Sequence, residues 1–376
     1  MKKLAIIGAS YLQLPLVLKA KEMGVESHCF AWEDGAVCKE VADYFYPNSI
    51  LDKEEILAVC QSVKVDGITS VASDAAVPTI CYVAEKMGLI SNQYTDALVA
   101  TDKYKMRQAF YKNGVCSPQF VFGEDVMFTD LKYPVIVKPT DRSGSRGVLK
   151  IERKEDLSNA ISRAKKESFS HQAIVEEYIS GKEVSVETIS YKGVHYILAI
   201  TDKVTTGEPY FVELEHHQPS MLSDYIQEKI KLETLKALNA LNVLYGASHT
   251  EIKITEDGEV YLIEVGARMG GDFIGSDLVQ LSTGYDFLKG VILITFGEFE
   301  EPVFSKQKCS GVYFLSKETE TIKNIIKNSD KYLGIVKAEI TDEHLRNIES
   351  SSDRSGYFIY QSEEKQIINT LNLLKS

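Results

Sequence analysis

Short apolar runs alternate with amphipathic stretches along the first quarter of the chain. The apolar runs predict buried strands at 3–8, 25–32 and 67–72. The amphipathic stretches predict helices at 15–23, 53–63 and 76–87. Two of these helices end at a glycine, the usual residue just past a helix C-terminus. Because strands that alternate with helices form a parallel, doubly wound sheet, we expect an α/β domain over residues 1–98.

Beyond residue 98 this alternation stops. Helices are expected at 102–113, 155–166 and 222–241, and short strands at 135–138, 148–151, 173–176, 183–190, 195–201, 311–315 and 357–360. A hairpin is expected over residues 250–265, where Asp257 and Gly258 give a strong signal for a two-residue turn. Antiparallel strands with separate helices indicate an α+β region distinct from the first domain.

The hairpin is the most informative segment because it brings two acidic residues together. A two-residue turn at Asp257 and Gly258 places Glu251 directly opposite Glu264 on one face of the sheet. Like charges at that spacing destabilise a sheet unless something compensates, and two carboxylates suit a hard divalent cation such as Mg²⁺. The alternative is a solvent-exposed hairpin whose acids repel only weakly. The hairpin by itself leaves both interpretations open.

Four further segments carry groups suited to phosphate. The loop 141–147 offers glycines, serines and two arginines between two strands, but it lacks the lysine signature of a Walker A loop. Lys138 ends an apolar strand and Lys103 lies in the first turn of a helix, where a cation needs an anionic partner. Arg268 precedes two glycines that permit close approach of a ligand. Taken singly, each has an ordinary explanation: a mobile loop, a solvated lysine or a turn.

Composition narrows the class of protein. The 376 residues carry 42 Lys and Arg against 54 Asp and Glu, a formal charge of −12, which argues against a partner that is nucleic acid or an anionic membrane. The six cysteines are scattered without a C-x-x-C pair, as in a reduced protein without zinc. Lys2 and Lys3 precede an apolar stretch that mimics a signal peptide, but Gly8, Gln13 and Pro15 interrupt it. We therefore expect a soluble, cytoplasmic protein.

Five motifs occur together along the chain. They are DKYKMR at 102–107, PVIVKP at 134–139, SGSRG at 143–147, VEEYISGKE at 175–183, and HTE at 249–251 with IEVGAR at 263–268. In this order and spacing the chain resembles the ATP-grasp enzymes. Within that superfamily it is similar to single-chain members of the carbamoyl-phosphate-synthase-like group, which includes the L-amino-acid ligases and the purine-pathway carboxylases.

The resemblance covers essentially the whole chain and implies four parts. It implies a Rossmann-like N-terminal domain at 1–98, an ATP-grasp subdomain with lid and hinge at 99–180, a second ATP-grasp subdomain with the metal and catalytic site at 181–300, and a small α+β C-terminal lobe at 301–376. The whole chain is then an α/β domain followed by α+β subdomains.

The resemblance also implies a role for each matching residue. The residues implied to bind ATP are Lys103, Lys138, Ser143, Gly144, Ser145, Arg146 and Gly147 at the phosphates, Glu176, Glu177 and Ile179 at the adenine, and Glu183 at the ribose. Glu251 and Glu264 would hold Mg²⁺, with Mn²⁺ as a substitute, and Arg268 would steady an acyl-phosphate. Gly266 stands where the family often has an asparagine that adds a metal ligand, so one or two ions remain open.

Weaker polar groups are plausible contacts to the substrates. They are Lys203, His217, Gly270, Gly271 and Asp272. Two histidines adjacent in a strand point to opposite faces, so at most one of His216 and His217 can enter a shared site. Asp272 either attracts the ammonium group of an acceptor or caps the turn that begins near Phe273.

The resemblance implies an ATP- and Mg-dependent ligase that joins a carboxylate to an amine through an acyl-phosphate and releases ADP and phosphate. Its partners would be small-molecule carboxylates and amines, amino acids among them, and the oligomeric state, including a homodimer, stays open. One alternative is a purine-pathway carboxylase or formyl-phosphate ligase, which needs a sugar-phosphate site that no Lys/Arg cluster of the first domain provides. The alternative of another class is a nucleotide-binding protein without catalysis, against which Glu251, Glu264 and Arg268 argue.

Overall fold

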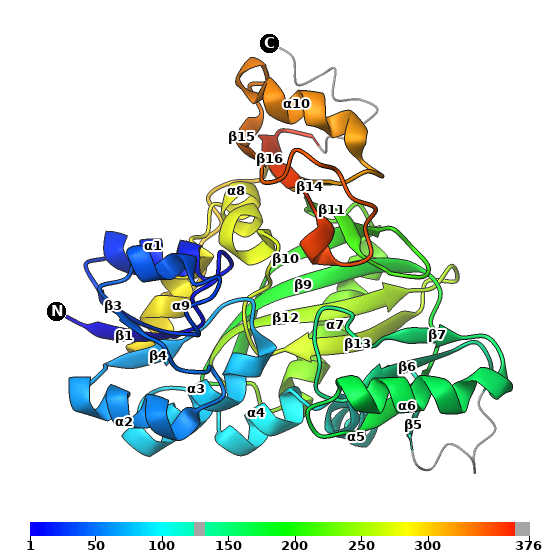
Figure 1. The fold of residues 1–376 in the computed structure, drawn as a ribbon, viewed down its shortest axis with the longest axis horizontal. Helices are drawn as coiled ribbons and strands as arrows, with labels where there is room; N and C mark the ends of the chain where they lie inside the picture. The colour runs from blue at the N-terminus through cyan, green and yellow to red at the C-terminus, as the bar shows by residue number, and fades with distance from the viewer. Residues whose placement is uncertain (124–131, 365–376) are drawn as a thin grey trace.

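The computed structural model describes residues 1–123 and 132–364. Their strands form three sheets: four strands in the first domain, four in the middle of the chain, and eight that reach into the C-terminal region. Figure 1 shows the first sheet on the left, the eight-stranded sheet in the centre and the other four-stranded sheet at the lower right. Among the described residues, no helix combines the length and the apolar character needed to cross a bilayer.

The first sheet is parallel, with the order β3-β2-β1-β4. Its strands are β1 (Lys3–Ile7), β2 (Glu26–Phe30), β3 (Tyr44–Tyr46) and β4 (Gly67–Thr69), and its region also holds α1 (Leu14–Glu22), α2 (Lys53–Val63), α3 (Val77–Met87) and α4 (Tyr94–Ala100). The three predicted strands and three predicted helices are confirmed. β3 and α4 were not predicted, because three and seven residues are too few to show a clear period.

A helix from far along the chain completes the core of this first domain. α9 (Phe287–Thr295) packs with α1 against the first sheet. Leu4 and Ile6 of β1 thus share one buried cluster with Phe287 and Val291. One buried cluster of the first domain therefore depends on this later helix, whereas a second cluster, around Ala5 and Ile7, comes from residues 1–98 alone.

The middle sheet is antiparallel, with the order β5-β8-β6-β7. Its strands are β5 (Phe120–Phe122), β6 (Val135–Pro139), β7 (Leu149–Ile151) and β8 (Ala173–Glu177), preceded by α5 (Lys103–Lys112). α6 (Leu157–Glu167) buries Leu157, Ala160, Ile161 and Ala164, a helical stripe that packs on the sheet. The α+β character expected here is confirmed.

The eight-stranded sheet has the order β13-β12-β9-β10-β11-β14-β16-β15. Its strands are β9 (Lys182–Tyr191), β10 (Val194–Thr205), β11 (Glu213–Gln218), β12 (Gly246–Ile254), β13 (Val260–Gly266), β14 (Cys309–Leu315), β15 (Ile335–Ile340) and β16 (Gly356–Ser362), and the helices of this region are α7 (Asp224–Ala240), α8 (Val279–Thr283), α9 and α10 (Lys323–Lys327). β14 pairs with β11, so the segment expected as a C-terminal lobe continues the same sheet. The expected boundary at residue 300 does not separate two sheets.

The hairpin of β12 and β13 has the expected pairing but a different turn. Glu251 lies opposite Glu264, as predicted. The turn is longer than two residues, because the N–H of Thr255 donates to the carbonyl of Glu259 at 3.0 Å. This turn shifts the pairing by one residue, and a bulge between Glu251 and Ile252 shifts it back. The cross-strand pair is thus confirmed and the two-residue turn is wrong.

Candidate active site

A cavity of about 200 Å³ lies where the first domain, the middle sheet and the eight-stranded sheet meet. Asp74 lines it from the first domain, Lys138 from the middle sheet and Glu264 from the eight-stranded sheet. Twelve of the residues singled out from the sequence line it: Lys103, Lys138, Ser143, Gly144, Ser145, Glu176, Glu177, Ile179, Glu183, Glu251, Glu264 and Arg268. The fold thus brings the five separate motifs to one place.

On the middle sheet, Lys138 takes part in a buried group of three charges. Its Nζ lies 2.6 Å from Oε2 of Glu176, and Nε of Arg107 lies 2.8 Å from Oε1 of the same carboxylate. Burial lowers the pKa of Lys138, and the charges of Arg107 and Lys103 lower it further against the effect of Glu176. Two cations share one anion, so this end of the cavity has positive charge available for a phosphate. Both carboxylate oxygens of Glu176, expected at the adenine, face these cations.

Lys103 connects the two sides of the cavity. Its Nζ donates to Oε1 of Glu264 at 2.8 Å and to the carbonyl oxygen of Arg142 at 2.6 Å. Burial disfavours its charged form, but Glu264, with Asp74 and Glu251, raises its pKa overall. The ammonium in the first turn of α5 therefore has the anionic partner that its position requires.

The loop between β6 and β7 lies at the mouth of the cavity. Gly144, Ser145 and Gly147 have φ angles of 67°, 54° and 72°, so the backbone turns sharply there. Ser143, Gly144 and Ser145 line the cavity, whereas Arg146 and Gly147, also expected at the phosphates, are not among its described lining residues. The structure thus brings three of the five loop residues to the cavity, and their role at the phosphates stays a prediction.

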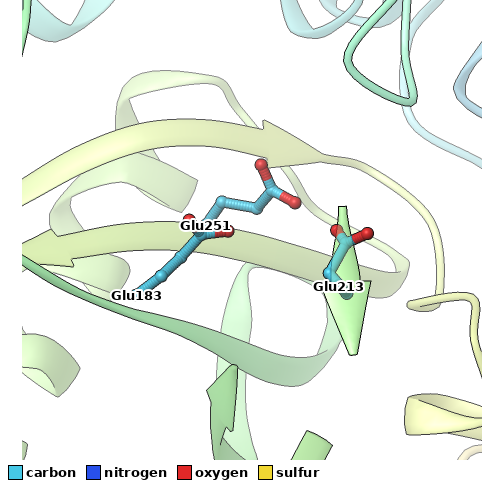
Figure 2. Close-up of side chains that lie close together, drawn as sticks. All are labelled: Glu183, Glu213 and Glu251. Carbon is cyan, nitrogen blue, oxygen red and sulfur yellow. The ribbon is translucent and has the colours of Figure 1, made fainter. Parts of the chain in front are cut away.

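Three glutamates converge on the eight-stranded sheet beside the cavity. Figure 2 shows Glu183 of β9, Glu251 of β12 and Glu213 of β11. One carboxylate oxygen from each lies within 4.8 Å of those from the other two. Nζ of Lys203, on β10, lies 3.0 Å from Glu183, 3.0 Å from Glu251 and 3.3 Å from Glu213. Burial opposes its charge, yet the three carboxylates raise the pKa of Lys203 well above its ordinary value. In turn, Lys203 holds the pKa of Glu251 well below its ordinary value.

Glu251 and Glu264, the residues expected to hold the metal, each have a lysine partner. Lys203 accompanies Glu251 and Lys103 accompanies Glu264. The repulsion expected between the facing glutamates is therefore compensated by two ammonium groups. Two cavity-lining carboxylates on paired strands, with Glu213 close by, are oxygen donors of the kind that Mg²⁺ takes together with phosphate oxygens. The residues present fit such an ion.

Arg268 is held by an aspartate of the first domain. Its Nε donates to Oδ1 of Asp74 and its Nη2 to Oδ2, both at 2.8 Å. Burial disfavours the charged form of Asp74, but Arg268 lowers its pKa overall. Asp74 was not predicted from the sequence. Its signal was position, because it follows β4 at the carboxyl edge of a parallel sheet, where such folds place their functional groups.

Gly270 and Gly271 lie against other parts of the structure rather than on the cavity lining. The N–H of Gly270 donates to Oε2 of Glu187 at 3.0 Å, and the other oxygen of Glu187 pairs with Nδ1 of His249 at 2.5 Å. A Cβ atom on Gly270 would lie 2.7 Å from both groups. A Cβ atom on Gly271 would lie 3.2 Å from the Cβ of Ala72. Both glycines thus permit close packing.

Asp272 contacts an arginine from the C-terminal region. Its Oδ2 accepts a hydrogen bond from Nη1 of Arg354 at 2.7 Å, and Nη2 of Arg354 donates to the carbonyl of Glu213 at 2.9 Å. Among the described residues, no side chain caps the helical segment that begins at Ile274. The hypothesis that Asp272 caps this segment is therefore wrong. The same carboxylate, expected otherwise to attract the ammonium group of an acceptor, is paired with Arg354.

The two adjacent histidines point to opposite faces of β11, as expected. His217 binds Oε2 of Glu215 through Nε2 and the hydroxyl of Tyr360 through Nδ1, each at 2.9 Å. His216 is the residue opposite Lys203, and its Nε2 lies 3.9 Å from Oδ2 of Asp272. His217, named as a substrate contact, is thus not brought to the cavity, and neither histidine lines it.

Known proteins share both this sequence and this arrangement. A model of the ATP-grasp domain matches residues 131–277. An alanine–anticapsin ligase of Bacillus subtilis is 30% identical over 321 residues, which cover 72% of this chain and 67% of the relative. The chain belongs to the ATP-grasp family. The resemblance seen in the five motifs is confirmed, and so is the prediction of an ATP-grasp ligase that forms carbon–nitrogen bonds.

Solved structures share the fold of this ATP-grasp enzyme along nearly its whole length. An L-amino acid ligase from Bacillus licheniformis superposes with a TM-score of 0.82 at 22% identity, covering 97% of this chain and 94% of the other. A phosphoribosylglycinamide synthetase from Anaerococcus prevotii gives 0.79 at 23% identity, covering 99% and 97%. The mixed α/β architecture is therefore that of ATP-grasp proteins.

Proposed function

We propose that this ATP-grasp ligase activates the carboxylate of an amino acid as an acyl-phosphate and transfers the acyl group to an amine. The observation that carries the proposal is the division of charge around one cavity. Lys138 and Arg107 share a single carboxylate on one side, whereas Glu183, Glu213 and Glu251 share Lys203 on the other. The first side suits phosphates and the second suits a cation, and Arg268 lines the same cavity.

ATP would lie with its terminal phosphates between Lys103, Lys138 and the loop 143–145. A lysine presents a point charge to phosphate, and the loop presents backbone N–H groups to it. The adenine would lie near Glu177 and Ile179, with the ribose near Glu183, all of which line the cavity. Residues 99–180 then form the part that covers the nucleotide, and residues 181–300 the part that carries the metal ligands.

Glu251 and Glu264 would hold Mg²⁺, which supplies neutralisation of phosphate charge. When the ion binds, Lys103 would leave Glu264 and stay beside the phosphates. Lys203 would leave Glu251 and stay beside Glu183 and Glu213. The substrate carboxylate attacks the γ-phosphorus, the bond to the ADP oxygen breaks, and an acyl-phosphate forms. The amine then attacks the acyl carbon, phosphate leaves with the bonding electron pair, and the nitrogen loses a proton. Arg268 would bind the acyl-phosphate through the N–H groups that Asp74 does not use.

Two observations support an amino acid as the carboxylate substrate. The alanine–anticapsin ligase acts, by its name, on alanine, and it shares 30% identity with this chain. A ribonucleotide substrate, as in the alternative of a purine-pathway enzyme, needs cations for its phosphate. The crevice at the carboxyl edge of the first sheet holds Trp32 and Asp34, and among its described lining residues none is Lys or Arg. This crevice disfavours the ribonucleotide.

The proposal is tested by ADP release from the purified protein with Mg²⁺ and ATP, screened against a matrix of amino acids and amines. We expect release that needs one amino acid together with an amine, and ADP with phosphate as the nucleotide products. AMP and pyrophosphate as the main products would contradict the acyl-phosphate route. Release that depends on a ribonucleotide instead would overturn the assigned substrate class.

A further inference from the structure

Gly266 carries no side chain, although the residues two positions before and after it both direct side chains to the cavity. Side chains two residues apart on a strand share a face, and Glu264, Gly266 and Arg268 all line the cavity. A Cβ atom on Gly266 would lie 2.6 Å from Oδ1 of Asp74 and 3.1 Å from Nε of Arg268. The carboxylate of Asp74 therefore occupies the space that a side chain at position 266 would take.

The segment that carries Asp74 is fixed to the segment that carries Arg268. Val71 forms a parallel bridge with Met269, and the N–H of Ala72 donates to the carbonyl of Met269 at 3.1 Å. Asp74 then grips Arg268 through two hydrogen bonds, and Nη1 of Arg268 donates to the carbonyl of Met269 at 3.2 Å. These contacts determine the plane of the guanidinium group and leave its remaining N–H groups for a ligand.

We infer that Asp74 is a positioning residue for Arg268, and that Gly266 is glycine because this carboxylate needs its space. The inference rests on the proposed role of Arg268 at the acyl-phosphate. A guanidinium that is already oriented loses no freedom when charge develops in the transition state. Because Asp74 belongs to the first domain, that domain then helps to fix the orientation of Arg268 at the reacting groups.

The first test moves the carboxylate from one segment to the other. Asp74→Ala should lower kcat by up to about 100-fold, because a misplaced group near the reaction can cost that much. The KM for ATP should change less than about twofold, since the phosphate contacts are untouched. The double variant Asp74→Ala with Gly266→Asp returns a carboxylate to the same space from β13 and should recover much of the lost kcat. Failure of recovery in a folded double variant would overturn the inference.

The second test uses steric exclusion alone. Gly266→Ala places a methyl group against Oδ1 of Asp74 and should lower kcat in the wild-type background. In the Asp74→Ala background the same methyl group meets no carboxylate, so it should change kcat little. Equal effects in both backgrounds would show that Gly266 serves another purpose and would overturn this part of the inference.

Three measurements separate this inference from other roles of Asp74 and from failure of the proposed function. Binding of Mn²⁺ in the presence of ADP, followed by calorimetry, should keep its stoichiometry in Asp74→Ala, and loss of an ion would make Asp74 a metal ligand instead. A rise in the KM for one substrate with kcat unchanged would make it a substrate contact. Arg268→Lys should lose activity, and full activity in that variant would refute the proposed role of Arg268 itself. Loss in Arg268→Lys with full activity in Asp74→Ala would refute the positioning role alone.

Discussion

Lys138 and Lys203 are both buried beside the same cavity, on different sheets, yet their pKa values shift in opposite directions. Lys138 has one carboxylate neighbour, Glu176, which it shares with Arg107, and its pKa is lowered. Lys203 lies within 3.3 Å of three carboxylates, and its pKa is raised well above the ordinary value. Each of these carboxylates also has a second basic neighbour: Lys253, Arg354 or His249. The count of nearby charges, rather than burial, decides the difference. The region of Lys138 has positive charge to offer an added anion, and the region of Lys203 has carboxylate oxygens to offer an added cation.

Removal of the cation from the acidic region should have the largest effect. Lys203→Met removes the cation that contacts all three of Glu183, Glu213 and Glu251 and leaves them with Lys253, Arg354 and His249 as basic neighbours. We expect the free energy of unfolding to fall by about 3 kcal/mol at pH 7, the lower end of the range for breaking a buried pair. Urea denaturation measures this. Since the carboxylates bind protons more readily in the folded state once Lys203 is removed, the deficit should shrink towards pH 5. The matched variant Lys138→Met leaves Arg107 with Glu176 and should cost only about 1–2 kcal/mol. Similar losses for both lysines would contradict the comparison.

Neutralisation of one metal ligand should have the next largest effect. Glu264→Gln should lower turnover at saturating Mg²⁺ by about 100-fold, the scale for loss of one group that stabilises developing charge. The stability of the variant without Mg²⁺ should not rise, because Lys103 loses its carboxylate partner. ADP release and urea denaturation measure these effects. Glu256→Gln, on the exposed turn of the same hairpin, is the control and should leave both values unchanged. A stabilised Glu264→Gln protein would mean that repulsion dominates at this pair.

The cation-rich region should respond through nucleotide affinity. Lys138→Met should weaken ADP binding by about 1.5–3 kcal/mol, the range for a hydrogen bond to a charged group. Isothermal titration calorimetry measures the change. Lys150→Met, on β7 of the same sheet and outside the described cavity lining, should bind ADP as the wild type does. Equal losses in the two variants would point to a general effect of charge.

The smallest expected effect is an exchange of protons. Because the pKa of Lys138 lies below that of an ordinary lysine, a fraction of this group is neutral at alkaline pH in the free protein. A bound phosphate favours the charged form, so ADP binding should take up less than one proton per nucleotide. The uptake should grow from pH 7 to pH 9 in titrations with buffers of different ionisation enthalpy. Lys138→Arg keeps its charge throughout and should abolish the pH-dependent part.

Local patterns were enough to predict much of this molecule. Three strands of the first sheet and their three helices follow from periodicity within short segments, and so does the opposition of Glu251 and Glu264. The turn of that hairpin could not be predicted from Asp257 and Gly258, because the side-chain hydroxyl of Thr255 accepts from the N–H of Glu259 at 3.0 Å and supports a longer turn. A compensating bulge then restored the pairing, and no local signal shows a bulge in advance.

Contacts between distant segments could not be predicted in the same way. Arg107 lies in the motif DKYKMR, but its ion pair with Glu176 depends on how α5 is placed relative to β8. Arg354 reaches Asp272 from 82 residues away along the chain, and Asp74 reaches Arg268 across 194 residues. The packing of α9 on the first sheet is of the same kind. The motifs thus located the cavity, whereas the partners that orient its charged groups come from tertiary packing.

The continuity of the eight-stranded sheet determines where this chain can be cut or joined. The backbone of β11 pairs with β10 on one side and with β14 on the other. Truncation before β14 would leave a free strand edge a few residues from Lys203 and Glu213, and such edges pair readily with other chains. Fusion partners are better attached beyond β16 than inserted near residue 300. The C-terminal strands β14, β16 and β15 thus cover the strand edge of β11 and move the free edge of the sheet away from the acidic residues.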